Sequence, residues 1–230
     1  MNKKLIIKKT EAFVKKTIFN NESCHDWWHV YRVWNLAKKI ASTERVDGFV
    51  VELGALLQDI ADAKLHNGDE TIGPRKAREF LQSVKVDEEI INHVENIIAN
   101  ISFRGELDVQ KFKSPELSVI QDADRLDAIG AIGIARTFSF GGYKNRSIFD
   151  PKIKPRFKMN KNQYINHQGT TINHFYEKLL LLKDKMNTAT GKKLAQHRHK
   201  ILENFLKDFF AEWRAIKYYK KYEQTKRYQP

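Results

Sequence analysis

The chain has 230 residues, of which 41% are hydrophobic and 11% aromatic, so wholesale disorder is excluded and a substantial core is expected. Cys24 is the only cysteine, which excludes an internal disulfide and a cysteine-based zinc site. No stretch approaches about 18 consecutive apolar residues, and the N-terminal apolar run is too short for a signal peptide. We therefore expect a cytoplasmic protein with no membrane partner.

The formal net charge of +13 is concentrated in three segments. Residues 1–16 carry six Lys against one Glu, residues 142–163 carry seven Lys or Arg against one Asp, and residues 214–230 carry six Lys or Arg against one Glu. The charge therefore lies on two tails and one loop. This distribution favours anionic partners such as phosphates, although solvated tails alone would also explain it.

Apolar residues recur at helical spacing along most of the chain, and strand signals are almost absent. In chain order, the pattern predicts helices over residues 5–19, 26–42, 48–59, 75–83 and 87–102, one that begins at Pro115, and others over 128–138, 171–185 and about 191–219. The sequence therefore predicts an all-α fold. We expect a single helical domain over residues 1–213, with residues 214–230 as a basic tail that continues the last helix.

The same spacing predicts which residues of the helices are buried. In the first helix these are Leu5, Ala12, Phe13 and Ile18, and in the second Trp27, Val30, Leu36, Ala37 and Ile40. The apolar run 53–60 indicates a helix buried on most sides, which Asp47 would cap. Residues 143 to about 170 contain Pro151, Pro155 and many basic residues, which is typical of a surface loop over a site.

Four short segments carry side chains that bind metals or transfer protons. They contain His25 and His29, four residues apart; Asp59 and Asp62, three apart; His93; and the three acids Asp122, Asp124 and Asp127. Residues at these spacings share one face of a helix. Each segment also has a plain structural explanation, such as a capped histidine pair, a solvated helix end, a core histidine or an ion pair with Arg125.

Together the four segments resemble the HD superfamily, in which a first His, a later His-Asp pair and a distant Asp hold a divalent metal. The sequence HVYRV at residues 29–33 looks like the first-His segment, Gln58-Asp59 stands where the His-Asp pair belongs, and Asp124 looks like the distant ligand. The resemblance is closest to the stand-alone bacterial HD proteins described as nucleotide pyrophosphohydrolases. It extends from His25 to about Trp213 and includes the specific block NHFY at residues 173–176.

The resemblance implies an HD-type helical domain with additional C-terminal helices and a metal-dependent phosphohydrolase that releases pyrophosphate from nucleoside triphosphates. The implied metal ligands are His29, Gln58, Asp59 and Asp124. For catalysis we expect Asp62 to position or deprotonate water, with Lys64 and His25 assisting. The expected substrate-binding residues are Arg32, His93, Asn173, His174 and Lys178, and the basic loop would close over a triphosphate. Arg32 could instead pair with a local acid.

Gln58 departs from the family pattern, which has His at that position. An amide oxygen is a poorer and harder donor than imidazole, so we expect Mn, Mg, Co or Ni to bind with affinity reduced on the order of 10–100-fold or more. The sequence leaves two hypotheses open: a weakened enzyme, or an impaired HD protein that binds nucleotide as a sensor or partner module. A basic tail interleaved with tyrosines also allows RNA binding, although we do not expect nucleic acid as the partner. A homodimer is compatible with the sequence.

Overall fold

The computed structural model describes residues 2–18, 26–61, 69, 71–101, 112–157 and 169–215. These residues form helices joined by turns and loops, and no strand occurs among them, which confirms the all-α prediction. Within the same ranges, every helix is either too short or too polar to cross a membrane.

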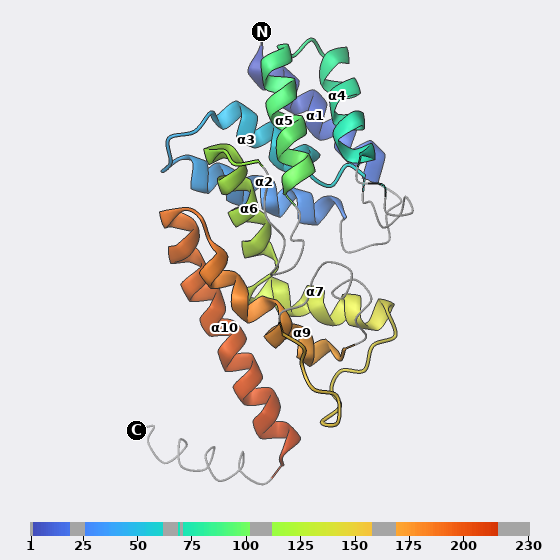
Figure 1. Ribbon diagram of the computed structural model, residues 1–230, viewed down its shortest axis with the longest axis vertical. Coiled ribbons are helices and arrows are strands. Elements are labelled where there is room, and N and C mark those ends of the chain that lie inside the picture. The colour runs from blue at the N-terminus through green and yellow to red at the C-terminus, as the bar shows by residue number, and fades with distance from the viewer. Residues whose placement is uncertain are drawn as a thin grey trace, which may run out of the picture.

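The helices form two groups that follow one another along the longest axis of the molecule (Figure 1). The first group contains α1 (Lys3–Ile18), α2 (Trp27–Ala41), α3 (Gly48–Leu57), α4 (Ile72–Ser83) and α5 (Glu88–Asn100). The second contains α7 (Gly130–Tyr143), α9 (Thr171–Glu177), the 3-10 helix η2 (Leu179–Lys185) and α10 (Ala189–Trp213). Helix α6 (Pro115–Asp127) belongs to both, because it packs against α2, α3 and α5 and also against α7 and α10.

Helix α3 is the centre of the first group. Its sequence GFVVELGALL is apolar almost all round, and nearly every side chain is buried. At Gly54 a Cβ atom would lie 2.6 Å from the terminal methyl group of Ile120, so a larger residue there would force the Ile120 side chain to shift between α3 and α6. The apolar run ends at Gln58 and Asp59, which places these two polar residues at the edge of the core facing α2 and α6.

Side-chain caps fix where the important helices begin. Asp26 accepts a hydrogen bond from the backbone N of His29 (2.8 Å), which places His29 in the first turn of α2. Ser114 caps α6 in the same way at the backbone N of Leu117, with Pro115 in the first turn. Thr188 caps α10 at Gly191.

Helix α6 is tied to the start of α10 by one buried carboxylate. Asp122 has no exposed surface, and its oxygens accept hydrogen bonds from the backbone N atoms of Asn187 and Thr188 (2.8 Å each) and from the Thr188 hydroxyl (2.8 Å). A buried carboxylate is stable only when such donors replace its hydration. Asp122 therefore joins the helix shared by both groups to the last helix of the chain.

The basic segment after α7 is irregular, as predicted, but residues 144–157 are anchored to α9 and α10. Backbone N atoms of Thr171 and Ile172 donate to the carbonyl oxygens of Ser147 and Ile148 (2.9 and 3.0 Å). The Phe149 ring packs against aromatic rings of α10, with its centroid 4.9 Å from that of Trp213. Residues 158–168, the second half of the predicted loop, lie outside the described residues.

Three local predictions are corrected. In α1 the buried residues are Ile6, Thr10, Val14 and Ile18, so Leu5 and Ala12, which we expected in the core, are exposed. Residues 171–185 are not one helix, because the backbone leaves helical geometry at Lys178 (φ −141°) between α9 and η2. The helix expected from residue 128 begins at Gly130, whose φ of +79° turns the chain between α6 and α7.

Candidate functional site

Three helices bring together the first histidine and two of the predicted acidic ligands. The Nε2 atom of His29, on α2, lies 3.1 Å from Oδ2 of Asp59, just after α3, and 3.4 Å from Oδ1 of Asp124, on α6. The His29 ring is 1% exposed, whereas the side chains of Asp59 and Asp124 are 21% and 40% exposed. The cluster is therefore buried on its histidine side and open on its carboxylate side.

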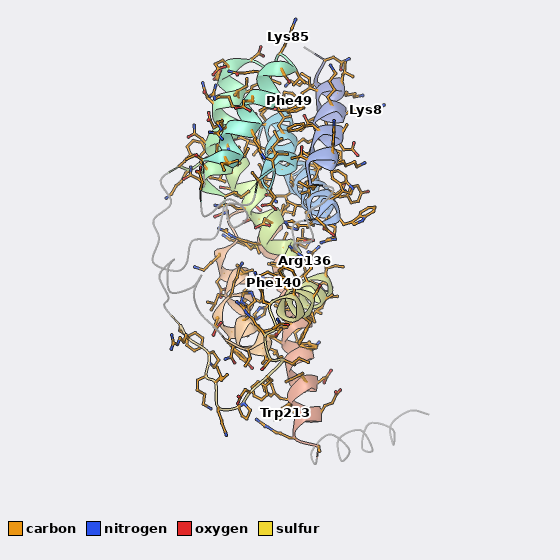
Figure 2. All side chains as sticks on the ribbon, turned by 90° about the vertical axis from the view of Figure 1, so that its right-hand side faces the viewer. Lys8, Phe49, Lys85, Arg136, Phe140 and Trp213 are labelled. Atoms are coloured by element: carbon orange, nitrogen blue, oxygen red, sulfur yellow. The ribbon has the colours of Figure 1, made fainter. Side chains whose placement is uncertain are left out.

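A fourth residue, Asp127, holds the other side of the His29 ring. The Nδ1 atom of His29 lies 2.8 Å from Oδ2 of Asp127, which is 1% exposed. Arg32 donates to the same carboxylate from Nε (2.7 Å) and Nη2 (3.0 Å), and Arg136 of α7 donates from Nη1 (2.8 Å). Figure 2 shows Arg136 at the level where the two groups of helices meet.

Asp127 was not among the predicted site residues. The signal that could have found it is its position three residues after Asp124, which puts both carboxylates on one face of α6. Arg136 had no such signal, because its contact with Asp127 depends on how α7 turns back after Gly130.

The electrostatics of the cluster favour one added positive charge. Burial alone would lower the pKa of His29, but its hydrogen bonds to Asp124, Asp127 and Asp59 hold that pKa well above the ordinary histidine value. Burial would raise the pKa of Asp127, but its bonds to His29 and Arg32 hold it well below the usual range. The pKa of Asp124 is also lowered, because the contact with His29 outweighs burial. The acids thus remain ionised, and a cation beside them is stabilised.

The donor set fits a divalent metal ion, although the described residues contain no preformed group of three or more His, Cys, Asp or Glu side chains with metal-site spacing. His29 instead contacts each carboxylate directly. Ligands bound to one ion at about 2.1 Å lie roughly 3.0 to 3.4 Å apart, which matches the separations of His29 from Asp59 and Asp124. A proton on His29 and a metal ion would satisfy the same carboxylates, so the two compete for this position.

Gln58 precedes Asp59 and is only 6% exposed. Neither its amide nitrogen nor its amide oxygen has a hydrogen-bond partner among the described residues. A buried polar group without a partner costs about 1–3 kcal/mol, so it is expected where a further ligand completes its contacts. The unsatisfied amide is consistent with an oxygen donor beside Asp59.

The remaining predicted site residues have different surroundings. Arg32 pairs with Asp127, the local-acid alternative considered above. His93 Nε2 lies 3.0 Å from the hydroxyl of Ser114, at the opposite end of α6. At 1.5 Å per residue, Ser114 is about 15 Å along the helix axis from Asp124. His93 is therefore not brought to the cluster around His29.

The predicted residues in and just after α9 have three different surroundings. The Asn173 side chain is buried and donates to the carbonyl oxygen of Ile153 (3.0 Å), so it supports the loop 144–157. The positive charge of Lys178 is one of the influences that lower the pKa of Asp124. Burial, with the nearby charges of Lys178 and Arg146, lowers the pKa of His174 to about 3.

The three predicted catalytic residues, Asp62, Lys64 and His25, lie outside the described residues. Their roles stay predictions.

Comparison with known proteins matches the part of the chain that contains His29, Asp59 and Asp124 to a known family. The family model of the HD domain matches residues 27–129, from the start of α2 to just beyond α6. The YpgQ protein of Bacillus subtilis is 37% identical over 202 residues, which cover 85% of this chain and 88% of YpgQ.

Solved structures agree with this relationship. The crystal structure of YpgQ in complex with ADP matches with a TM-score of 0.71 at 33% identity, over 90% of this chain and 97% of YpgQ. A Lactobacillus plantarum protein matches with a TM-score of 0.81 at 36% identity, over 91% and 97% of the two chains. An HD-superfamily hydrolase from Bacillus thuringiensis matches with a TM-score of 0.74 at 42% identity, over 93% and 100%. This chain therefore belongs to the HD-domain family.

Proposed function

We propose that this chain is a metal-dependent phosphohydrolase that acts on nucleotides, and that it releases pyrophosphate from nucleoside triphosphates. The observation that carries the proposal is the convergence of His29, Asp59 and Asp124 from three different helices. The similarity to the Bacillus thuringiensis HD-superfamily hydrolase supports hydrolysis. The similarity to YpgQ, whose structure contains ADP, supports a nucleotide as the substrate class.

In this proposal His29, Gln58, Asp59 and Asp124 hold Mn, Mg, Co or Ni, with affinity reduced by Gln58. A divalent ion at this position supplies Lewis acidity toward a phosphoryl oxygen and lowers the pKa of a water molecule that it binds. In this proposal Asp62 accepts the proton of the water that attacks the α-phosphorus, and the bond between the α-phosphorus and the bridging oxygen to the β-phosphate breaks. Lys64 and His25 stabilise or protonate the pyrophosphate that leaves.

The charge balance of the described residues suits an anionic substrate. Asp59, Asp124 and Asp127 carry three negative charges, and Arg32 and Arg136 carry two positive ones. With a neutral His29 and a divalent ion, the difference is a net charge of +1 in a partly buried setting. Lys178, which follows α9, adds a further positive charge close enough to influence Asp124. Phosphate oxygens would therefore be attracted to the open, carboxylate side of the cluster.

A second candidate is an impaired HD protein that binds a nucleotide without hydrolysing it. Gln58 favours this alternative, because it stands where the family has a metal-binding imidazole and its amide has no hydrogen-bond partner within the part of the chain that the structure describes. Such a protein would show nucleotide-dependent thermal stabilisation without turnover in any common divalent metal.

The deciding experiment measures phosphate and pyrophosphate release from a panel of nucleoside triphosphates with Mg, Mn, Co and Ni. The wild-type chain and Gln58→His are assayed side by side, with Asp59→Ala and Asp124→Ala as inactive controls that should retain full helicity. Turnover by both the wild type and Gln58→His supports a working enzyme that tolerates Gln58. Turnover by Gln58→His alone favours the second candidate, a protein that binds nucleotide without hydrolysing it. Full activity of either Asp→Ala variant would refute the proposed metal site.

A further inference from the structure

Asp127 is the most heavily bonded side chain of the site, and it touches no open surface. It is 1% exposed and contacts side chains from two other helices: His29 and Arg32 of α2, and Arg136 of α7. We infer that Asp127, clamped by Arg32 and Arg136, is a positioning residue that fixes the His29 ring with Nε2 directed at the metal position. This role rests on the proposed function, because it concerns the proposed metal ligand His29.

The chemistry of the imidazole ring explains how this clamp, formed by Asp127 with Arg32 and Arg136, would affect metal binding. A neutral histidine binds a metal through one ring nitrogen only if the other nitrogen carries the proton. At His29 the nitrogen on the buried side is Nδ1, 2.8 Å from Asp127, and the nitrogen facing Asp59 and Asp124 is Nε2. The N–H donors of both arginines require the Asp127 oxygens to accept, so Nδ1 must be the donor.

The two arginines also fix where the carboxylate lies. Arg32 donates through two nitrogens of one guanidinium, which sets the plane of the Asp127 carboxylate, and Arg136 donates to the oxygen that His29 contacts. Arg32 comes from the first group of helices and Arg136 from the second. The orientation of the His29 ring therefore depends on the packing of both groups, and not on α2 alone.

A matched control, Asp122, lies five residues earlier on the same helix. Asp122 is equally buried and also accepts several hydrogen bonds, but they come from Asn187 and Thr188 at the start of α10. The donors to Asp122 thus belong to the start of α10, whereas Asp127 contacts His29 itself. A purely structural role for Asp127 predicts the same behaviour for both acids, whereas a positioning role predicts that only Asp127 alters metal binding.

The test is calorimetric titration of Mn2+ into the full chain carrying Asp127→Asn or Asp122→Asn, each in the wild-type and in the Gln58→His background. The temperature is one at which circular dichroism shows each variant folded. We expect Asp127→Asn to weaken Mn2+ binding on the order of 10–100-fold, the effect typical of losing the partner of a metal-binding histidine. Asp122→Asn should leave Mn2+ affinity unchanged. The visible absorption bands of bound Co2+ should shift in Asp127→Asn only.

If Asp127→Asn does not fold, Arg136→Met tests the same clamp by leaving Asp127 with Arg32 alone. It should weaken Mn2+ binding less than the loss of Asp127, and Arg136→Lys should restore part of the affinity. Wild-type Mn2+ affinity and an unshifted Co2+ spectrum in the folded variant would overturn the positioning role. Mn2+ binding by Gln58→His but not by the wild type would instead overturn the proposed native ligand set. The positioning role of Asp127 is then tested by comparing the Asp127→Asn and Asp122→Asn variants in the Gln58→His background. No Mn2+ binding in either background would overturn both.

Discussion

Replacing Asp122 by Asn should destabilise the protein more than its nearly identical shape suggests. The two carboxylate oxygens accept from the backbone N of Asn187 (2.8 and 3.1 Å), the backbone N of Thr188 (2.8 Å) and the Thr188 hydroxyl (2.8 Å). An Asn side chain turns one of these oxygens into an NH2 group. Both oxygens face N–H donors, so either orientation of the amide sets donor against donor in a fully buried place.

The magnitude follows from the bonds that are lost. A hydrogen bond to a charged group contributes about 1.5–3 kcal/mol, and at least two such bonds are lost or weakened. We therefore expect Asp122→Asn to lower the free energy of unfolding by about 3–5 kcal/mol, within the range for breaking a buried charged network. At an unfolding entropy of about 2.1 cal/mol/K per residue, this corresponds to a decrease in Tm of about 6 to 10 °C for a chain of this length.

The assay is thermal and urea unfolding followed by circular dichroism, with EDTA present so that bound metal does not add stability. Glu79→Gln is the control, because the ion pair of Glu79 with Arg75 lies on the exposed surface of α4 and its loss should leave the transition unchanged. An Asp122→Asn protein within about 1 kcal/mol of the wild type would refute the reasoning, since ordinary surface substitutions reach that range.

Two further predictions concern a turn and a titration. Gly130→Ala should lower the free energy of unfolding by about 1–2 kcal/mol, because φ is +79° and a Cβ atom would lie 3.1 Å from the Arg198 side chain. Gly142→Ala is the control, because a Cβ atom there would have no neighbour within 4 Å. Equal urea midpoints for the two variants would contradict this prediction. His174, with its pKa lowered to about 3, stays neutral in the fold while the unfolded chain takes up a proton below about pH 6.5. Its contribution to stability is therefore complete above that pH and falls on acidification by at most about 1.4 kcal/mol per pH unit. His174→Asn should show a shallower loss of stability between about pH 6 and 4.5, and identical slopes would contradict the assignment.

The helices and the centre of the site could be predicted because their signals are local. The apolar run within α3 predicted a helix buried on most sides, and the burial of nearly all its side chains confirms that prediction. Val30, Ala37 and Ile40 of α2 are fully buried, as expected. His29, Asp59 and Asp124 come together as the family resemblance implies, since their positions on three helices follow from the sequence pattern.

The predictions for α1 and for residues 171–185 were wrong because the sequence of each segment fits two arrangements, and tertiary packing determines which one forms. Helix α1 has apolar residues on two adjacent stripes, and the stripe that is buried includes the polar Thr10. Burial of Thr10 is possible because its hydroxyl donates to the carbonyl oxygen of Ile6 (2.9 Å) within the same helix. Residues 179–182 are all Leu and fit either an α-helix or a 3-10 helix, so only the tertiary contacts of η2 with α9 and α10 decide its form.

The clamp was beyond sequence reasoning for a different reason. Asp127 and Arg136 are nine residues apart but lie on separate helices, and their contact depends on the turn at Gly130. Long-range partners of this kind become visible only when the helices are placed in space.

The hydrogen bonds of α6 bear on whether the segment that matches the HD-domain model, residues 27–129, can fold by itself. Residues 27–129 contain all four proposed metal ligands, yet within that segment Asp122 would lose its donors from residues 187 and 188, Asp127 would lose Arg136, and the Leu126 carbonyl oxygen would lose Arg198. A fragment cut at residue 129 would thus deprive two buried carboxylates of hydrogen-bond donors that the intact chain supplies. The ligand-bearing segment is therefore not a transplantable unit, and a graft of this site into another protein must include α7 and the start of α10.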